Sequence, residues 1–221
     1  MFIICFNSIQ AQHVIKALPR WMVNAHFQMM VPGSPLTRFH EKVSFGYLAE
    51  AQYRLQYNKP FLGGVYFAEA GLSRYSLKYF ERGIEIKEKA NTRRMEGGVT
   101  FGFYPEVNWL LQPYLQGRAG VALFQSSSIL TDADSQELIE RISESATFAP
   151  GYGLDAGIHI VPNIWYVRGN IRVGWTGNTS TTILLLDESL QMPESYPIES
   201  FRSITTAASW WNISLGLSYL F

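Results

Sequence analysis

The sequence has little cysteine, no excess charge and no long apolar run. Its one cysteine among 221 residues, Cys5, lies near the N-terminus, so the rest of the chain can form no disulfide and offers no thiolate metal site. The 18 basic and 18 acidic residues cancel, which gives no reason to expect nucleic acid as a partner. No segment reaches the roughly 18 consecutive apolar residues of a spanning helix, so any crossing of a membrane must be made by strands.

What the sequence has instead is alternation. Apolar and polar residues exchange with a period of two, the pattern of strands with one apolar and one polar face. Near the C-terminus, Trp211, Ile213 and Leu215 fall on one face, and Asn212 and Ser214 fall on the other. The pattern predicts strands at roughly 21–31, 43–55, 66–73, 94–103, 111–123, 151–160, 165–175 and 211–221.

The segment at 66–73 alternates less clearly than the others, and we expect a bulge there. By the same rule its apolar face holds Tyr66, Ala68, Ala70 and Leu72, and its polar face holds Glu69, Gly71 and Ser73.

Short and long connections alternate between these segments. Short turns at 58–60, 105–107 and 162–163 separate long polar connections near 33–42, 75–92, 126–145 and 177–203. This is the order of periplasmic turns and outer loops in an outer-membrane barrel, and it predicts that both termini lie in the periplasm. In the long connections we expect a short helix at 135–142. It is either an amphipathic helix that makes a contact or an ordinary capped helix within the loop. The apolar run at 183–186 predicts contact with a partner or packing over the barrel mouth.

The polar face of the segments carries charges of both signs, which can pair inside a narrow lumen but would be costly against lipid. We therefore assign the apolar face to the outside and predict a lumen network of paired charges that fills the barrel and stiffens it. Its expected members are Glu50, Arg54, Glu69, Glu96, Arg118, Asp155, Arg168 and Arg172. The alternative is a soluble, lipocalin-like barrel with the apolar face turned inward.

Residues 1–11 are expected to be a signal peptide, and residues 12–221 the barrel domain. The segment has a short apolar run and a possible cleavage after Ala11. It lacks a positively charged start, and Ile9 is large for its position before the cut, so the start of the chain could be truncated. The alternative is an ordinary buried N-terminal strand.

The end of the chain carries the sharpest motif. Apolar and aromatic residues alternate up to the last position, and they are Ile213, Leu215, Leu217, Tyr219 and Phe221. With this motif the chain resembles the small eight-stranded outer-membrane barrels of the OmpA transmembrane-domain and OmpX type over nearly all its mature length. The resemblance implies an all-β, antiparallel, up-and-down transmembrane barrel. It also implies that these residues are the signal read by the outer-membrane assembly machinery. We expect no peptidoglycan-binding domain of the kind that full-length OmpA-type proteins carry.

The second long connection is basic, and its residues are candidates for contact with lipopolysaccharide phosphates. They are Lys78, Arg82, Lys87, Lys89 and Arg93; the alternative is a solvated extension of the hairpin. The acidic side chains of the later connections match no calcium loop. His159 and Asp155 share the lumen face without an obvious nucleophilic serine beside them. We therefore expect no catalytic residue, no cofactor and no metal.

The sequence thus predicts a non-enzymatic barrel, integral to the outer membrane, with a structural or interaction role. Its expected partners are outer-membrane lipid and lipopolysaccharide, the assembly machinery during biogenesis, and a partner protein or host surface at the outer loops. The alternatives are a lipid-modifying barrel enzyme and a narrow channel or transport accessory.

Overall fold

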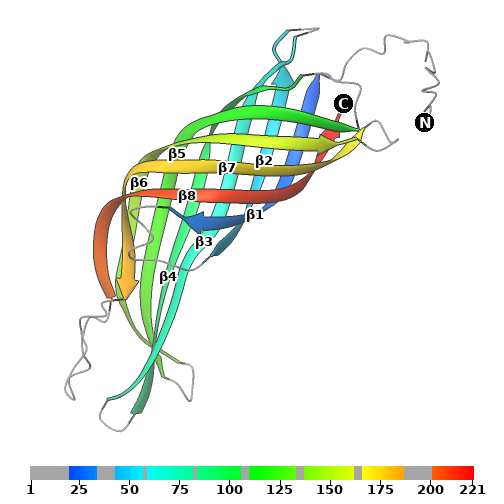
Figure 1. The fold of residues 1–221 in the computed structure, drawn as a ribbon. Helices are drawn as coiled ribbons and strands as arrows, with labels where there is room; N and C mark the ends of the chain where they lie inside the picture. The colour runs from blue at the N-terminus through cyan, green and yellow to red at the C-terminus, as the bar shows by residue number, and fades with distance from the viewer. Residues whose placement is uncertain are drawn as a thin grey trace, which may run out of the picture.

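The computed structural model is a closed barrel of eight antiparallel strands (Figure 1). It describes residues 20–33, 43–56, 59–81, 84–105, 110–132, 137–161, 166–186 and 201–221. The expected signal peptide at 1–11 lies outside these ranges, as do Arg82 and most of the short turns. In the described ranges, no helix is long and apolar enough to span a membrane.

Each strand pairs with its neighbours in the chain, and β1 closes the barrel on β8. The strands are β1 (Trp21–Pro32), β2 (Ser44–Arg54), β3 (Phe61–Glu81), β4 (Ile84–Phe103), β5 (Leu111–Asp132), β6 (Leu138–Ile160), β7 (Val167–Leu186) and β8 (Phe201–Leu220). The predicted fold class is confirmed. The start of β1, the C-terminal Phe221 and the strand ends that border the β2–β3, β4–β5 and β6–β7 connections lie at one end of the barrel, here called the turn end.

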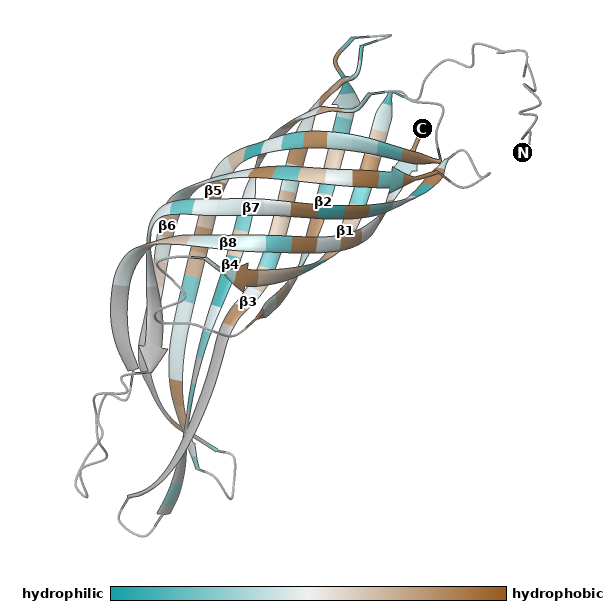
Figure 2. Cartoon of the chain, viewed as in Figure 1, coloured by the Kyte–Doolittle hydropathy of each residue, from teal (hydrophilic) through white to brown (hydrophobic). Residues whose placement is uncertain are grey.

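Side chains alternate between the outer surface and the lumen along the strands. In β2, Phe45 and Tyr47 are exposed, whereas Glu50 and Gln52 are buried. The outer surface carries Val, Leu, Ile and aromatic residues. Figure 2 shows segments of hydrophobic residues, in brown, recurring along the strands of the barrel wall. An apolar exterior around a largely polar interior is the reverse of a soluble barrel, so the lipocalin-like alternative does not fit this fold.

Strand β3 corrects the prediction made for its two faces. Tyr66, Ala68 and Leu72 point into the lumen, and Glu69 lies on the outer surface. The assignment failed because both faces of this strand are largely apolar, so a period of two does not say which face is inside. The expected bulge is confirmed, because the register between β3 and β4 shifts between Gly71 and Ser73.

Where the structure describes them, the predicted long loops at 75–92, 126–145 and 177–203 are almost entirely strand. The β3–β4, β5–β6 and β7–β8 hairpins run past the end of β1 and β2, at what is here called the mouth end (Figure 1). The helix expected at 135–142 is wrong for the part that the structure describes, since Leu138 begins β6. The run at 183–186 lies in β7. Each strand continues because its hairpin partner supplies backbone hydrogen bonds beyond the barrel wall.

Strands β6 and β7 stop pairing before either strand ends. The β6–β7 ladder ends at the pair Gly151 and Asn178, although both strands continue beyond it. Pro150 has no N–H to donate to the next rung, and the β7–β8 register shifts between Asn178 and Thr181. The Asn178 side chain donates from Nδ2 to the Pro150 carbonyl at 3.4 Å. Above this point β3 to β6 form one sheet and β7 with β8 a separate hairpin.

Candidate functional site

The middle of the lumen is filled by a network of buried charged and hydrogen-bonding side chains, here called the central network. Its members are Asn24, Glu50, Gln52, Tyr66, Arg94, Glu96, Gln116, Arg118, Asp155 and Arg172. They come from seven of the eight strands, all except β8. The network therefore ties opposite walls of the barrel together.

Two arginines and two acids make the core of the central network. Arg172 Nη1 lies 3.0 Å from Glu50 Oε1 and 3.9 Å from Asp155 Oδ2. Arg118 Nε lies 2.7 Å from Asp155 Oδ2. All four side chains are almost fully buried. Buried charges persist only when paired, and here each carboxylate faces a guanidinium.

A second branch of the network joins β3 to β4. Tyr66 donates its hydroxyl to Glu96 Oε1 at 2.5 Å, and Arg94 forms an ion pair with the same carboxylate. The guanidinium of Arg118 lies 5.5 Å from the centre of the Tyr66 ring. This cation–π contact connects the branch to the two arginines and two acids at the core of the network.

Neutral amides complete the hydrogen bonding of the Glu50 carboxylate. Gln116 donates from Nε2 to Glu50 Oε1 at 2.7 Å, and Asn24 donates from Nδ2 to Glu50 Oε2 at 3.1 Å. The Gln116 Oε1 atom accepts from Gln52 Nε2 at 3.1 Å and from the Tyr104 hydroxyl at 2.7 Å. Such hydrogen bonds lower the cost of burying a charged group.

The structure brings only part of the predicted lumen network together. Glu50, Glu96, Arg118, Asp155 and Arg172 are members of the central network. Arg54 and Arg168 lie outside it, where Arg54 donates to the Lys59 carbonyl at 2.8 Å and Arg168 to Gln112 Oε1 at 2.8 Å.

Glu69 is not a lumen residue. It faces outward with β3's other odd positions, and its Oε1 lies 2.5 Å from Arg93 Nη2 on the outer surface. Sequence reasoning left five network members out of the predicted network, namely Asn24, Gln52, Tyr66, Arg94 and Gln116. Tyr66 was assigned to the outer face with the inverted β3. The other four lie on faces predicted to be polar, Gln116 in phase with Arg118, but were given no role.

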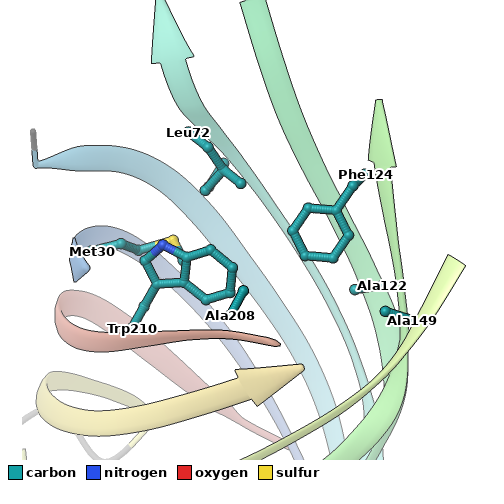
Figure 3. Close-up of a cluster of buried hydrophobic side chains, with 8 residues drawn as sticks. Met30, Leu72, Ala122, Phe124, Ala149, Ala208 and Trp210 are labelled. Carbon is teal, nitrogen blue, oxygen red and sulfur yellow. The ribbon is translucent and has the colours of Figure 1, made fainter. Parts of the chain in front are cut away.

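Toward the mouth end the lumen becomes apolar, which the sequence analysis did not predict. The mouth cluster, shown in Figure 3, consists of Met30, Ala70, Leu72, Ala122, Phe124, Ala149, Ala208 and Trp210. The Phe124 and Trp210 rings stack with centroids 6.0 Å apart and planes 21° apart. Arg94 lies 5.0 Å from the Trp210 ring centre, so the mouth cluster rests directly on the central network.

A second apolar group closes the turn end. This turn-end cluster consists of Met22, Leu62, Tyr104, Tyr114 and Leu220. The Tyr104 and Tyr114 rings stack with centroids 4.8 Å apart, and His159 packs against both at 5.8 Å and 4.8 Å. This ring packing fits an imidazole that fills the lumen better than one that acts on a substrate.

The predicted lipopolysaccharide contacts lie partly within the described residues. Arg93 and Lys89 are exposed on β4, and Lys87 is half-buried. Lys78 is paired with Lys87 in the β3–β4 register. Arg82 lies outside the described ranges.

The predicted assembly-signal residues all lie on the outer surface, four of them on β8 and Phe221 directly after it. They are Ile213, Leu215, Leu217, Tyr219 and Phe221. The last residue also closes the barrel, since Trp21 N donates to the Phe221 carbonyl at 3.0 Å and Phe221 N donates to the Trp21 carbonyl at 3.1 Å.

Metal binding finds no support in the described part of the chain. There, no three histidine, cysteine, aspartate or glutamate side chains are grouped so that they could hold an ion.

Comparison with known proteins gives the fold and no family. No protein-family model matches the chain, and no curated protein matches it significantly. Among solved structures, a major outer membrane protein from Thermus thermophilus matches with a TM-score of 0.50 and 11% identity, over 91% of this chain and 99% of that one.

Two further structures match at lower scores. The outer membrane protein OprG from Pseudomonas aeruginosa matches with a TM-score of 0.49 and 12% identity, over 93% of this chain and 97% of that one. Neisserial surface protein A matches with a TM-score of 0.46 and 14% identity, over 91% of this chain and 97% of that one. The closed eight-stranded barrel and the match at a TM-score of 0.50 give the chain the fold of the small outer-membrane β-barrels.

Proposed function

We propose that this chain spans the outer membrane as a closed, non-enzymatic barrel and acts as a scaffold for contacts made by its extended strands. The observation that carries the proposal is the distribution of polarity. Phe101, Leu154 and Leu217 are among the many large apolar residues on the outside, whereas the charged residues of the central network are buried inside. Only a hydrocarbon environment favours that arrangement, because the closed ladder leaves no backbone edge unpaired in lipid.

The proposed orientation puts the turn end and both termini in the periplasm. Turn connections of outer-membrane barrels are short and outer loops are long, and here the long hairpins all extend from the mouth end. A signal peptide at 1–11 would direct export, and the exposed alternating residues of β8 would serve the assembly machinery.

A channel is the less favoured alternative, because three successive layers fill the lumen. The turn-end cluster, the central network and the mouth cluster follow one another along the barrel, and their side chains are buried. An interior of eight strands is just wide enough for side chains to fill. We therefore expect no conductance in planar bilayers, and a steady conductance from the wild-type protein would overturn the scaffold function.

Membrane insertion is tested by gel mobility of the outer-membrane fraction with and without boiling. A closed barrel resists detergent until heated, so we expect a heat-dependent shift in that fraction. A soluble protein without a shift would refute the membrane location. The enzymatic alternative is tested by the mass of lipid A in a deletion strain, which we expect to be unchanged.

A further inference from the structure

The bulge in β3 decides which residues stand opposite the lysines of β4. Below it, Gly71 is paired with Arg93; above it, Arg74 is paired with Asn91, Ser76 with Lys89, and Lys78 with Lys87. An uninterrupted register would instead have paired Tyr75 with Lys89 and Leu77 with Lys87. The extra residue therefore places Lys78 directly across the ladder from Lys87.

Lys78 and Lys87 form a like-charge pair directly across the ladder. Like charges in this position destabilise a hairpin. On the other side of β4 the partners of Lys87, Lys89 and Arg93 are Thr131, Ile129 and Gln125, all neutral. Within the described part of the chain, no acidic side chain pairs with Lys87 or Lys89. These two lysines can therefore take an anionic ligand.

The basic residues begin where the apolar exterior ends. On β4 the outward positions run from Phe101 and Val99 through Met95 to Arg93 and Lys89. With a rise of about 3.3 Å per residue, Arg93 lies about 7 Å along the strand beyond Met95, and Lys89 about 20 Å beyond it. Those distances correspond to the head-group region and the layer above it.

We propose that the outer face of the β3–β4 hairpin binds phosphate groups of lipopolysaccharide in the surrounding leaflet. Lys87 and Lys89 supply the upper contact, and Lys78 is paired with Lys87 in the register of the ladder. Arg93 supplies the lower one, where its guanidinium keeps donors beyond those used by Glu69. This inference rests on the proposed membrane location and orientation, and it names the ligand that the hairpin takes there.

The test uses the full-length barrel in phosphatidylcholine vesicles, with the affinity for added lipopolysaccharide measured at low and physiological salt. The double variant Lys87→Gln with Lys89→Gln is expected to bind about 10- to 30-fold more weakly, since each basic residue near an anionic surface contributes a few-fold. Lys59→Gln, which makes the same kind of charge change at the turn end, should bind like the wild type. Equal affinity of the double variant and the wild type would overturn the proposal.

The variant Lys78→Glu separates ligand binding from a structural role. It places opposite charges across the ladder, so the barrel should unfold at the same or a higher urea concentration while lipopolysaccharide affinity falls at least as far as in the double variant. A parallel loss of stability and affinity would contradict the phosphate site. Two losses of lipopolysaccharide binding are compared, one caused by millimolar inorganic phosphate and one caused by dephosphorylation of the lipopolysaccharide. If the first is as large as the second, the ligand is free phosphate and the lipid source is overturned.

The scaffold function and the phosphate site can fail separately. A heat-shifted barrel in the membrane fraction with unaltered lipopolysaccharide affinity in these variants would refute only the site. A protein that never enters the membrane would refute both.

Discussion

The middle of the lumen is filled by polar side chains, whereas its mouth end is filled by apolar ones. Both must exclude water from a narrow tube. The central network does so with arginines, acids and amides that pair with one another, whereas the mouth cluster uses two stacked rings, Leu72, Met30 and four alanines. The comparison teaches that facing the lumen does not require a polar residue; it requires that the neighbours across the barrel match.

The largest expected effect comes from breaking the central network. Arg172→Ala leaves the buried Glu50 without its guanidinium and removes one partner of Asp155, and unpaired buried charges are strongly destabilising. We expect the free energy of unfolding to fall by about 5 kcal/mol, measured by urea unfolding in lipid vesicles. The double variant Glu50→Ala with Arg172→Ala should lose little more than the single one. A strictly additive double variant would show that the pair is not coupled.

The mouth cluster should be easier to damage without losing the fold. Trp210→Ala removes the ring stacked on Phe124 and exposes Arg94 from above, at an expected loss of about 3 kcal/mol. Because the central network still fills the tube, the variant should not conduct ions in planar bilayers. Conductance on this single change would mean that the mouth cluster alone closes the lumen.

A smaller effect is expected at the junction between the two layers. Tyr66→Phe keeps the ring under Arg118 but removes the hydroxyl that donates to Glu96. Leaving one buried acceptor short of a donor costs about 1 to 3 kcal/mol. The unfolding midpoint should fall by less than in Trp210→Ala. An unchanged midpoint would show that Arg94 alone stabilises the Glu96 carboxylate.

The smallest effect is expected outside the lumen. Glu69 and Arg93 form a close ion pair, but their side chains are 35% and 47% exposed. Pairs of that kind contribute about 0 to 1 kcal/mol, so Glu69→Ala should unfold almost like the wild type in the same urea experiment. A loss comparable to that of Arg172→Ala would show that burial does not explain the difference between the two pairs.

Much of the fold could be predicted because the barrel imposes its rule on every strand. Alternation identified the outer face of seven strands, and the order of short and long connections gave the two ends of the barrel. The outer face of the eighth strand, β3, was not identified, because Ala68, Ala70 and Leu72 can face either lipid or the lumen. Which face of β3 points into the lumen depends on the side chains across the barrel, such as Phe124 and Trp210. The spacing of residues in the sequence does not show these contacts.

The candidate sites were predicted less well for a related reason. Charged residues such as Glu50 and Arg172 are 122 positions apart in the chain, so their face is predictable but their pairing is not. The length of the hairpins was also underestimated, because polar strands beyond the wall have no apolar stripe to mark them. The shift at Gly71 was expected as an irregularity, but its effect on the basic residues becomes visible only in the paired strands.

The parting of β6 and β7 at Pro150 and Asn178 has a consequence for how the protein opens. Beyond it, β7 is hydrogen-bonded on one side only, in a two-stranded unit that is marginal by itself. Backbone amides of β7 past Thr181 should therefore exchange with deuterium much faster than those of β5, which keeps a partner on both sides as far as Asp132. The molecule would then open from this hairpin, with the rest of the barrel still closed.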